Sequence, residues 1–272
     1  MKPIVKWAGG KTQLLPEILP IIPEFNTYYE AFAGGLALFF ELNPKKAVIN
    51  DINIELINLY RQVAKNPKKL FDGVEALDNE HSASKDGKQF FYNQRDLFNS
   101  NLETNTIDQA IRFIYLNKHC FNGLYRVNSK GYFNVPFNSN NGGSSQELDN
   151  LKDISKLLNK TEILCGDFEA SVKKAKKGDF VFFDSPYAPL NPTSFTDYTK
   201  EGFGYDEHVR LANLYKKLSK RGVKCMLTNH NTDLIHELYK DFNIKIVDVH
   251  RNINSKADNR KGQEVIITNY EQ

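Results

Sequence analysis

Asp179-Phe-Val-Phe-Phe-Asp-Ser-Pro-Tyr187 is the stretch of this 272-residue chain that most directly indicates its fold. Residues 179–183 have the length and the Val/Phe composition of a buried β-strand, and polar residues follow at once. In open α/β sheets the carboxyl ends of the strands form the crevice that binds ligands, so we expect Asp184, Ser185 and Tyr187 to face such a crevice. The alternative is an ordinary strand exit in which the acid and the serine form a turn.

A strand, turn and helix pattern lies nearer the N-terminus. Residues 27–31 predict a strand, Phe32-Ala-Gly-Gly35 a tight turn and 36–42 a helix. Glycines directly after a strand let the backbone approach a ligand closely. The next strand, 47–50, ends on Asp51, about 20 residues beyond the turn, where a carboxylate can accept hydrogen bonds from a ribose diol. The glycines do not form G-x-G-x-x-G, which favours a nucleoside without phosphates; the alternative is a simple turn followed by a helix-capping acid.

The segment Lys6-Trp-Ala-Gly-Gly-Lys-Thr12 ends like a phosphate-binding loop. The full pattern requires a glycine where Val5 stands, and only Ile4 and Val5 are available as the strand that should precede it. We therefore exclude a nucleotide-phosphate loop, and Lys11 needs another role.

Composition and charge describe an ordinary globular protein. With 40% hydrophobic and 12% aromatic residues, 272 residues can bury a full core. No window approaches the 18 apolar residues of a membrane helix and the N-terminus lacks the apolar core of a signal peptide, so we expect a cytoplasmic protein without membrane contact. The net charge of +3 permits a polyanionic partner without requiring one. Three widely spaced cysteines indicate no disulfide framework and no zinc ribbon, and we expect buried thiols.

Residues 80–159 interrupt the α/β pattern. Helical segments at 89–98 and 107–118 are followed by a hairpin pattern over 124–137 and a polar, glycine-containing loop. This region mixes cations with aromatic rings, which suits phosphate contacts and base stacking, although hairpin aromatics more often serve packing. The cations are Lys118, His119, Arg126 and Lys130, and the rings are Phe121, Tyr125, Tyr132 and Phe133. We predict an inserted domain of helices and a hairpin.

The α/β pattern resumes after residue 160. The segment from Ala188 to Gly202 is long and polar, which predicts a mobile loop at the active site. The cations Arg251, Lys256, Arg260 and Lys261 predict a basic loop, for which a solvated surface is the commoner explanation.

Seven short motifs follow one another at specific spacings: Lys6-Trp-Ala-Gly-Gly-Lys11, Phe32-Ala-Gly-Gly35, Asn50-Asp51, Asn122-Gly-Leu-Tyr-Arg-Val-Asn-Ser-Lys-Gly131, Phe133-Asn-Val-Pro136, Gly166-Asp-Phe168 and Asp184-Ser-Pro-Tyr187. In this order they resemble the adenine-specific DNA methyltransferases of the Dam and DpnM type (D12 class), almost from end to end. The resemblance implies an α/β fold with a Rossmann-like, mostly parallel methyltransferase sheet and an antiparallel last strand. It implies that 1–79 and 160–272 form the S-adenosylmethionine-binding catalytic domain and that 80–159 form the inserted target-recognition domain.

The resemblance also implies the chemistry, which is methyl transfer from S-adenosylmethionine to the exocyclic amino group of adenine. Asp184 and the carbonyl of Ser185 would accept the two amino protons, which localises the nitrogen lone pair, and Tyr187, after Pro186, would stack on the flipped-out base. The cofactor brings the reactive methyl group, and no metal is expected. The residues implied in cofactor binding are Trp7, Lys11, Phe32, Gly34, Asp51, Asp167, Phe168 and Asp184, with Phe168 beside the cofactor's adenine.

One residue departs from the family pattern, which has proline where this chain has Ser185. The carbonyl is kept and Pro186 still favours an extended residue before it, but some rigidity is lost. We predict an active enzyme; the alternative is a methyltransferase-like DNA-binding protein with impaired catalysis. A methyltransferase for RNA or protein amides is a third hypothesis, which the hairpin and Arg126 disfavour.

For the inserted region the resemblance implies binding to double-stranded DNA. It places Arg126 where GATC-specific relatives read a guanine edge, and bidentate contact to guanine is the commonest specific contact of arginine. GATC is therefore the leading target, although the residues after Pro136 differ and leave the outer bases open. A separately acting restriction endonuclease is a candidate partner, and we expect a monomer or weak dimer. The implied DNA-binding residues are Phe121, which would enter the base stack, Asn122, Leu124, Arg126 and Pro136.

Overall fold

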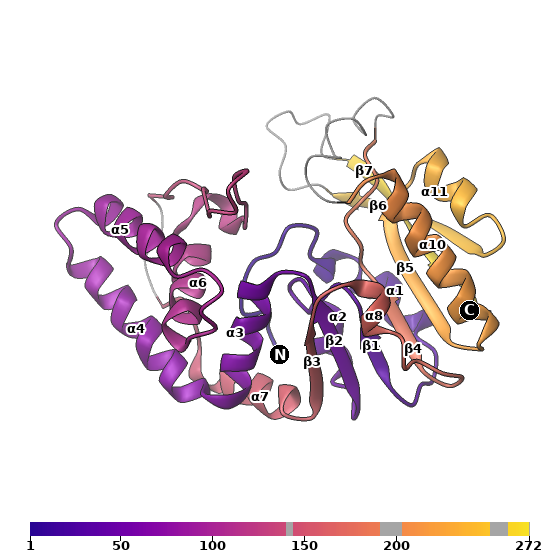
Figure 1. The fold of residues 1–272 in the computed structure, drawn as a ribbon, viewed down its shortest axis with the longest axis horizontal. Coiled ribbons are helices and arrows are strands. Elements are labelled where there is room, and N and C mark those ends of the chain that lie inside the picture. The colour runs from indigo at the N-terminus through magenta and orange to yellow at the C-terminus, as the bar shows by residue number, and fades with distance from the viewer. Residues whose placement is uncertain (140–143, 191–202, 251–260, 272) are drawn as a thin grey trace. The chain divides into compact units, whose positions relative to one another are not determined.

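The computed structural model describes residues 1–139, 144–190, 203–250 and 261–271 (Figure 1). Most of the predicted mobile loop, 191–202, and three cations of the predicted basic loop, Arg251, Lys256 and Arg260, lie outside these residues. The described elements are η1 Lys11–Gln13, α1 Leu15–Ile18, η2 Leu19–Ile21, β1 Tyr28–Glu30, α2 Ala37–Leu42, β2 Ala47–Asp51, α3 Ile54–Lys65, α4 Pro67–Ala83, α5 Gly87–Ser100, α6 Ile107–His119, η3 Phe121–Gly123, α7 Leu148–Leu158, β3 Thr161–Cys165, α8 Phe168–Ser171, β4 Phe180–Phe183, α10 Tyr205–Lys220, β5 Lys224–His230, α11 Asp233–Leu238, β6 Asn243–His250 and β7 Lys261–Thr268.

The described strands form one seven-stranded sheet in the order β3-β2-β1-β4-β5-β7-β6. Strand β1 pairs in parallel with β2 and β4, and β4 pairs in parallel with β5. Strand β7 runs antiparallel to both of its neighbours, β5 and β6. The predicted α/β fold, with a mostly parallel Rossmann-like sheet and an antiparallel last strand, is confirmed.

Strand β4 forms at the position predicted from its sequence. All four side chains of Phe180–Phe183 are at most 1% exposed, because a strand with parallel neighbours on both edges is also covered on both faces. Burial of one such side chain stabilises the fold by about 1.5–3 kcal/mol. Gly178 enters the strand with φ +91°, and a Cβ there would lie 2.5 Å from Asn26 Nδ2. The strand ends directly before Asp184 and so delivers the polar motif to the carboxyl end of the sheet.

The chain divides into two compact units, described here separately. The first comprises Met1–Lys11, Ala33–Lys45 and Asn50–Gly166, and the second comprises Thr12–Phe32, Lys46–Ile49 and Asp167–Gln272. In the first unit α3 packs on α6 and α7, and α4 packs on α6. Helix α4 continues without a break through residues 79 and 80. The functional domains expected at 1–79 with 160–272 and at 80–159 remain a prediction.

Asn117 on α6 fixes the N-terminal segment within the first unit. Its Oδ1 accepts a hydrogen bond from Lys6 N at 2.9 Å, and its Nδ2 donates to Lys6 O at 2.9 Å and to Gly123 O at 2.8 Å. The side chain is 5% exposed, so these bonds form away from competing water and are strong. One amide therefore sets the backbone just before Trp7 and just after Asn122.

The three cysteines differ in exposure. Cys120 and Cys225 are buried, as expected, but Cys165 is exposed and its prediction was wrong. Cys165 is the last residue of β3, which is one of the two edge strands of the described sheet. Among the described residues, we find no helix with the length and apolar composition needed to cross a bilayer.

A buried histidine makes the stability of the protein pH-dependent. His208 on α10 is 2% exposed, its ring meets the ring of Phe203 at 4.9 Å, and within the described part of the chain its Nε2 atom has no hydrogen-bond partner. Burial lowers the pKa of His208 to about 4. The unfolded chain therefore takes up a proton near the ordinary histidine pKa of about 6.5, where the folded chain does not.

We expect this difference to remove about 3 kcal/mol of stability as the pH falls from 6.5 to 4, with no further change from this residue below that range. Denaturant unfolding of the wild type and of His208→Leu at pH 7, 5.5 and 4 measures it. The variant should lose less stability than the wild type over this range. An equal loss of stability in the two proteins as the pH falls would show that His208 is not the source of the pH dependence.

Candidate active site

The glycine turn after β1 requires glycine for two reasons. Gly34 has φ +46°, in the left-handed region that disfavours side chains, and a Cβ there would lie 2.9 Å from Cδ1 of Trp7. The Gly34 carbonyl accepts a hydrogen bond from the Tyr60 hydroxyl at 2.5 Å, and its amide donates to Asp51 Oδ2 at 3.0 Å. The structure thus brings together three residues predicted for one site, Trp7, Gly34 and Asp51.

Asp51 stands at the carboxyl end of β2, as predicted. Its second oxygen, Oδ1, accepts from Asn53 N at 2.9 Å. Burial raises the pKa of Asp51, and the backbone amides of Gly34, Asn53 and Ile52 partly offset that rise because they stabilise the carboxylate. Each carboxylate oxygen has a second lone pair that can accept a ligand hydroxyl. The next residue, Ile52, is 78% exposed, which is unusual for a large apolar side chain and was not among the predicted site residues.

Trp7 and Lys11 occupy the N-terminal segment of the first unit. The indole of Trp7 stacks on Tyr125 at 5.4 Å and on Phe113 at 6.4 Å between ring centroids. Lys11 is 5% exposed, and its ammonium donates to the carbonyl of Gly9. Tyr125 therefore serves packing, as does Phe133, which is 3% exposed.

Two of the predicted cofactor residues form an aromatic cluster in the second unit. The rings of Phe32 and Phe168 stack with centroids 5.3 Å apart, and Phe203 meets them at 5.8 and 6.0 Å. Phe168 is 5% exposed and begins α8, whose N-cap is Asp167 with its side chain accepting from Glu169 N at 2.9 Å. Asp167 and Phe168 are consequently held in fixed positions at the start of this helix.

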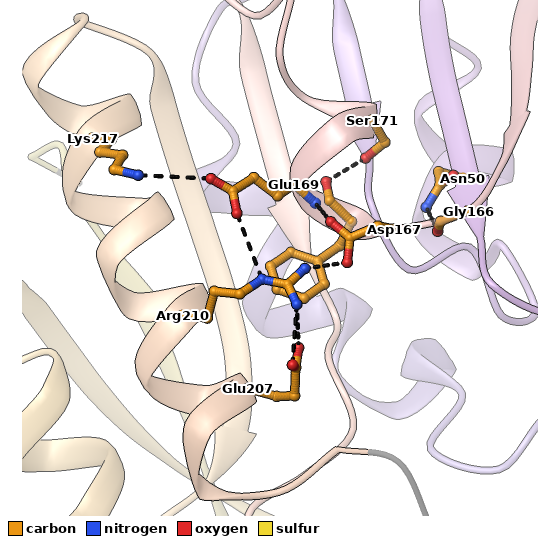
Figure 2. Close-up of polar contacts among 9 residues, drawn as sticks. Asn50, Gly166, Asp167, Glu169, Ser171, Glu207, Arg210 and Lys217 are labelled. Carbon is orange, nitrogen blue, oxygen red and sulfur yellow. Dashed lines mark hydrogen bonds and ion pairs between the residues drawn. The ribbon is translucent and has the colours of Figure 1, made fainter.

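Arg210 on α10 binds this cluster and was not predicted from the sequence. Its guanidinium lies 4.2 Å over the ring of Phe168 and forms ion pairs with Asp167, with Glu207 at 2.9 Å and with Glu169 at 3.5 Å. Figure 2 shows Arg210 surrounded by these three acids. Burial alone would raise the pKa of Asp167, but the hydrogen bond from Arg210 and that from Glu169 N hold it below its usual value. Asp167 therefore stays ionised.

The motif predicted to be catalytic, Asp184 to Tyr187, contacts side chains from β5, which pairs with β4, and from β7, which lies one strand further along the sheet. Thr228 Oγ1 on β5 donates to Asp184 Oδ1 at 3.0 Å. The hydroxyl of Tyr187 donates to Glu264 Oε2 on β7 at 2.6 Å, and the Tyr187 ring meets His230 edge to face at 4.6 Å. Burial first, and then the carboxylates of Asp184 and Glu264, raise the pKa of Tyr187, so its hydroxyl stays protonated.

The predicted DNA-binding residues lie on and beside a short hairpin of the first unit. Val127 and Phe133 form an antiparallel bridge, and Asn128 N donates to Tyr132 O at 2.9 Å across the turn. Arg126 is exposed, and its Nε donates to Asn134 Oδ1 at 2.8 Å, which orients the guanidinium. Large apolar side chains on this hairpin and before it remain exposed: Phe121 at 51%, Tyr132 at 45% and Val127 at 42%.

The other residues of this predicted set are joined by backbone contacts. Phe121 N donates to Pro136 O at 2.8 Å, and Leu124 N donates to Phe121 O at 3.3 Å. Asn122 lies between them with φ +56°, a left-handed conformation that asparagine adopts more readily than most residues. The backbone thus turns sharply between Phe121 and Leu124.

The sheet order, with polar residues at the carboxyl ends of β2 and β4, is that of a Rossmann-like methyltransferase fold. A family model of D12 class N6 adenine-specific DNA methyltransferases matches residues 7–253. The chain belongs to this family, and it is a DNA adenine methyltransferase.

Individual relatives match over nearly the full chain. The type II methyltransferase M1.LlaDCHI of Lactococcus lactis subsp. cremoris is 45% identical over 277 residues, which cover 99% of this chain and 96% of that protein. The type II methyltransferase M.MjaIII of Methanocaldococcus jannaschii is 44% identical over 287 residues, with 99% of both chains covered. The DNA adenine methylase of Haemophilus influenzae is 34% identical over 269 residues, which cover 97% of this chain and 92% of that protein.

Proposed function

We propose that this enzyme transfers the methyl group of S-adenosylmethionine to N6 of a flipped-out adenine in a short duplex site, with GATC as the leading target. The observation that supports this most directly is the catalytic motif at the end of β4, where Thr228 fixes the Asp184 carboxylate at 3.0 Å. A carboxylate held at the carboxyl end of a central parallel strand is placed to contact a ligand.

In the proposed reaction the protein localises the lone pair of the adenine amino group. Asp184 and the carbonyl of Ser185 each accept a hydrogen bond from the amino group, and the nitrogen would then attack along the line of the sulfur–methyl bond. A nitrogen–carbon bond would form as the sulfur–carbon bond of the bound cofactor breaks with its electrons going to sulfur, and the proton released by the methylated nitrogen would pass to the Asp184 carboxylate and from there to solvent. The bound cofactor supplies the activated methyl group, while the protein supplies position and electrostatics. Tyr187 stacks on the base after it leaves the duplex.

Methyl incorporation from radiolabelled S-adenosylmethionine into unmethylated duplex DNA tests the proposal. Duplexes with and without GATC, together with a competing RNA duplex, separate DNA from RNA specificity and show the target. We expect incorporation into the GATC duplex alone. Cofactor binding without incorporation into any DNA would instead favour the catalytically impaired DNA-binding protein, which family membership over nearly the whole chain does not favour.

The proposed cofactor contacts in the first unit are Trp7, Lys11, Gly34 and Asp51, with Asp51 accepting from the ribose hydroxyls. In the second unit they are Phe32, Asp167, Phe168 and Asp184, with the aromatic cluster beside the cofactor's adenine. The rings of Phe32 and Phe168 stack at 5.3 Å. This supports the placement of the cofactor's adenine beside the aromatic cluster, because an aromatic surface suits a planar base.

We predict that Arg210→Ala weakens cofactor binding. The change removes the cation over Phe168 and leaves Asp167 without its ion pair, so the start of α8 loses two restraints. A cation over a ring contributes about 0.5–1 kcal/mol and an exposed ion pair at most about 1 kcal/mol, which together give roughly a tenfold rise in the Kd for S-adenosylhomocysteine. Titration calorimetry measures it. Lys217→Ala is the matched control, because Lys217 pairs with Glu169 at 3.7 Å without a described contact to Phe168; an equal effect of the two changes would contradict this role.

For DNA, we predict that Arg126→Ala relaxes the choice of target sequence. A bidentate arginine to guanine contributes about 1–3 kcal/mol of discrimination, so the ratio of kcat/KM for GATC over sites with that guanine replaced should fall about 10- to 100-fold. Lys130→Ala on the same hairpin is the control, since loss of a phosphate contact weakens binding to all sequences alike. An unchanged methylation pattern in Arg126→Ala would refute the readout.

The proposal extends to partners. Two of the relatives are named type II methyltransferases, which supports a restriction endonuclease that acts separately on the same site. A monomer or weak dimer and a cytoplasmic location remain predictions.

A further inference from the structure

The carboxyl end of β5 lies beside the point where β4 ends and the motif from Asp184 to Tyr187 begins. In the parallel pairing of β4 with β5, Phe182 is the partner of Met226 and Phe183 is the partner of Leu227. The next two residues of β5, Thr228 and Asn229, are both 0% exposed. Thr228 bonds to Asp184, as described above, and the two residues that follow it on β5, Asn229 and His230, lie beside the part of the motif that follows Asp184.

The side-chain amide of Asn229 joins the two ends of the segment from Ser185 to Ala188. Its Nδ2 donates to Ser185 Oγ at 3.3 Å, and its Oδ1 accepts from Ala188 N at 2.8 Å. Oδ1 also accepts from His230 N at 2.9 Å, which fixes the rotamer of the amide itself. Ser185 is 2% exposed and Ala188 is 0% exposed, so water does not compete for these bonds.

We propose that Asn229 is a positioning residue of the methyl-transfer reaction, because its amide holds the Ser185 carbonyl at the place where it accepts the adenine amino proton. This inference rests on the proposed function, in which that carbonyl is one of the two acceptors. Pro186 restricts Ser185 to extended geometry from one side, and the bond from Asn229 restrains the Ser185 side chain from the other. The Ser185 hydroxyl thereby gains a structural role, since it accepts one of the hydrogen bonds by which β5 holds the motif.

The size of the effect follows from the sensitivity of catalysis to position. A displacement of a reacting group by about 1 Å lowers a rate by up to about 100-fold. Loss of one of the two hydrogen bonds that Asn229 makes to this segment loosens the Ser185 carbonyl without removing it. We therefore expect kcat to fall by less than this upper limit. Binding of the cofactor and of DNA involves other contacts and should change little.

Two substitutions of one residue test the proposal. In Ser185→Ala the acceptor for Asn229 Nδ2 is lost, and we expect kcat to fall about tenfold with the KM values for S-adenosylmethionine and for DNA within twofold of wild type. In Ser185→Pro the hydroxyl is also lost, but the ring fixes φ near −65° and restores rigidity through covalent geometry. We expect Ser185→Pro to be at least threefold faster in kcat than Ser185→Ala.

A rescue experiment separates positioning from stability. Asn229→Ala removes the acceptor of a buried amide, so it lowers both stability and kcat. If Asn229 acts through Ser185, the double variant Asn229→Ala with Ser185→Pro should have a higher kcat than Asn229→Ala alone. A purely structural asparagine would give no such rescue in the folded fraction, which thermal unfolding quantifies.

The far end of the same strand offers a matched control. Asn269 Nδ2 donates to Ser219 Oγ at 2.7 Å, and Asn269 Oδ1 accepts from Cys225 N at 2.7 Å. Ser219→Ala thus breaks the same kind of serine–asparagine bond beside β5, but away from the motif. We expect its kcat to equal that of the wild type.

Two results would overturn the inference: a Ser185→Ala enzyme with wild-type kcat, or a Ser185→Pro enzyme no faster than Ser185→Ala. A wild-type protein that transfers no methyl group to any DNA would refute the proposed function instead. In that case amide hydrogen exchange at Ala188 still tests whether Asn229 joins Ser185 to Ala188 through its two hydrogen bonds. Exchange should be faster in Ser185→Ala than in the wild type and in Ser219→Ala. Unchanged exchange would contradict the claim that Asn229 restrains the segment from Ser185 to Ala188.

Discussion

Asp184→Ala is expected to abolish methyl transfer while leaving the fold intact. The change removes the carboxylate that accepts an amino proton in the proposed reaction, and positioned groups of this kind accelerate reactions by about 10²- to 10⁴-fold. We expect kcat to fall at least about 1000-fold in single-turnover assays. Asp184 lies directly after the buried strand β4 and is only partly buried, so the loss of fold stability should be modest.

Asp184→Asn and Asp241→Ala serve as controls for this prediction. Asparagine keeps the shape and one acceptor oxygen but not the charge, and we expect a kcat between those of alanine and the wild type. Asp241 is an exposed acid after α11, and its replacement should change nothing. Turnover of Asp184→Ala at the wild-type rate would remove Asp184 from the reaction.

Asp51→Ala is expected to lower the affinity for the cofactor by about 100-fold or more. Hydrogen bonds to a charged group contribute about 1.5–3 kcal/mol each, and the proposed ribose diol makes two of them. The same change leaves the amides of Gly34 and Asn53 without the acceptor they have at 3.0 and 2.9 Å, so the glycine turn itself loses an anchor. The protein should also become less stable by about 1–3 kcal/mol.

The cofactor affinity can be followed through Trp7, the single tryptophan of the chain, which lies against Gly34. Titration with S-adenosylhomocysteine should change its fluorescence in the wild type at concentrations that leave Asp51→Ala unaffected. Asp51→Asn keeps an acceptor for Gly34 N and separates the anchoring of the turn from the charge. Equal affinities in all three proteins would exclude Asp51 from the cofactor site.

Local sequence patterns were sufficient for the parts of the site that depend on neighbours in the chain. The Val/Phe run of β4 predicts a buried strand because strand composition is a local property, and the motif from Asp184 to Tyr187 follows from where the strand stops. Gly34 and Asp51 were predicted from the turn and strand that carry them. The structure adds the physical reason for the glycine, which is the indole of Trp7 at 2.9 Å from the position of a Cβ.

The residues that hold the site in place were not predicted, because each contacts a distant part of the chain. Arg210 reaches Asp167 across 43 residues, Asn229 reaches Ser185 across 44, and Glu264 reaches Tyr187 across 77. On its own helix or strand each has the pattern of an ordinary polar residue. The exposure of Cys165 was also not predicted, because it depends on β3 being an edge strand, and only the sheet order shows that position.

The place of β7 in the sheet has a consequence for the time at which activity arises during synthesis. Strand β7 lies between β5 and β6, yet it follows both in the chain, so β6 cannot reach its position until β7 has left the ribosome. Glu264 on β7 is also the residue that accepts the hydroxyl of Tyr187 at 2.6 Å. A nascent chain that already carries Asp184 to Tyr187, the motif proposed to carry out methyl transfer, therefore lacks the strand whose Glu264 binds Tyr187, and we expect chains that stop before residue 261 to be inactive.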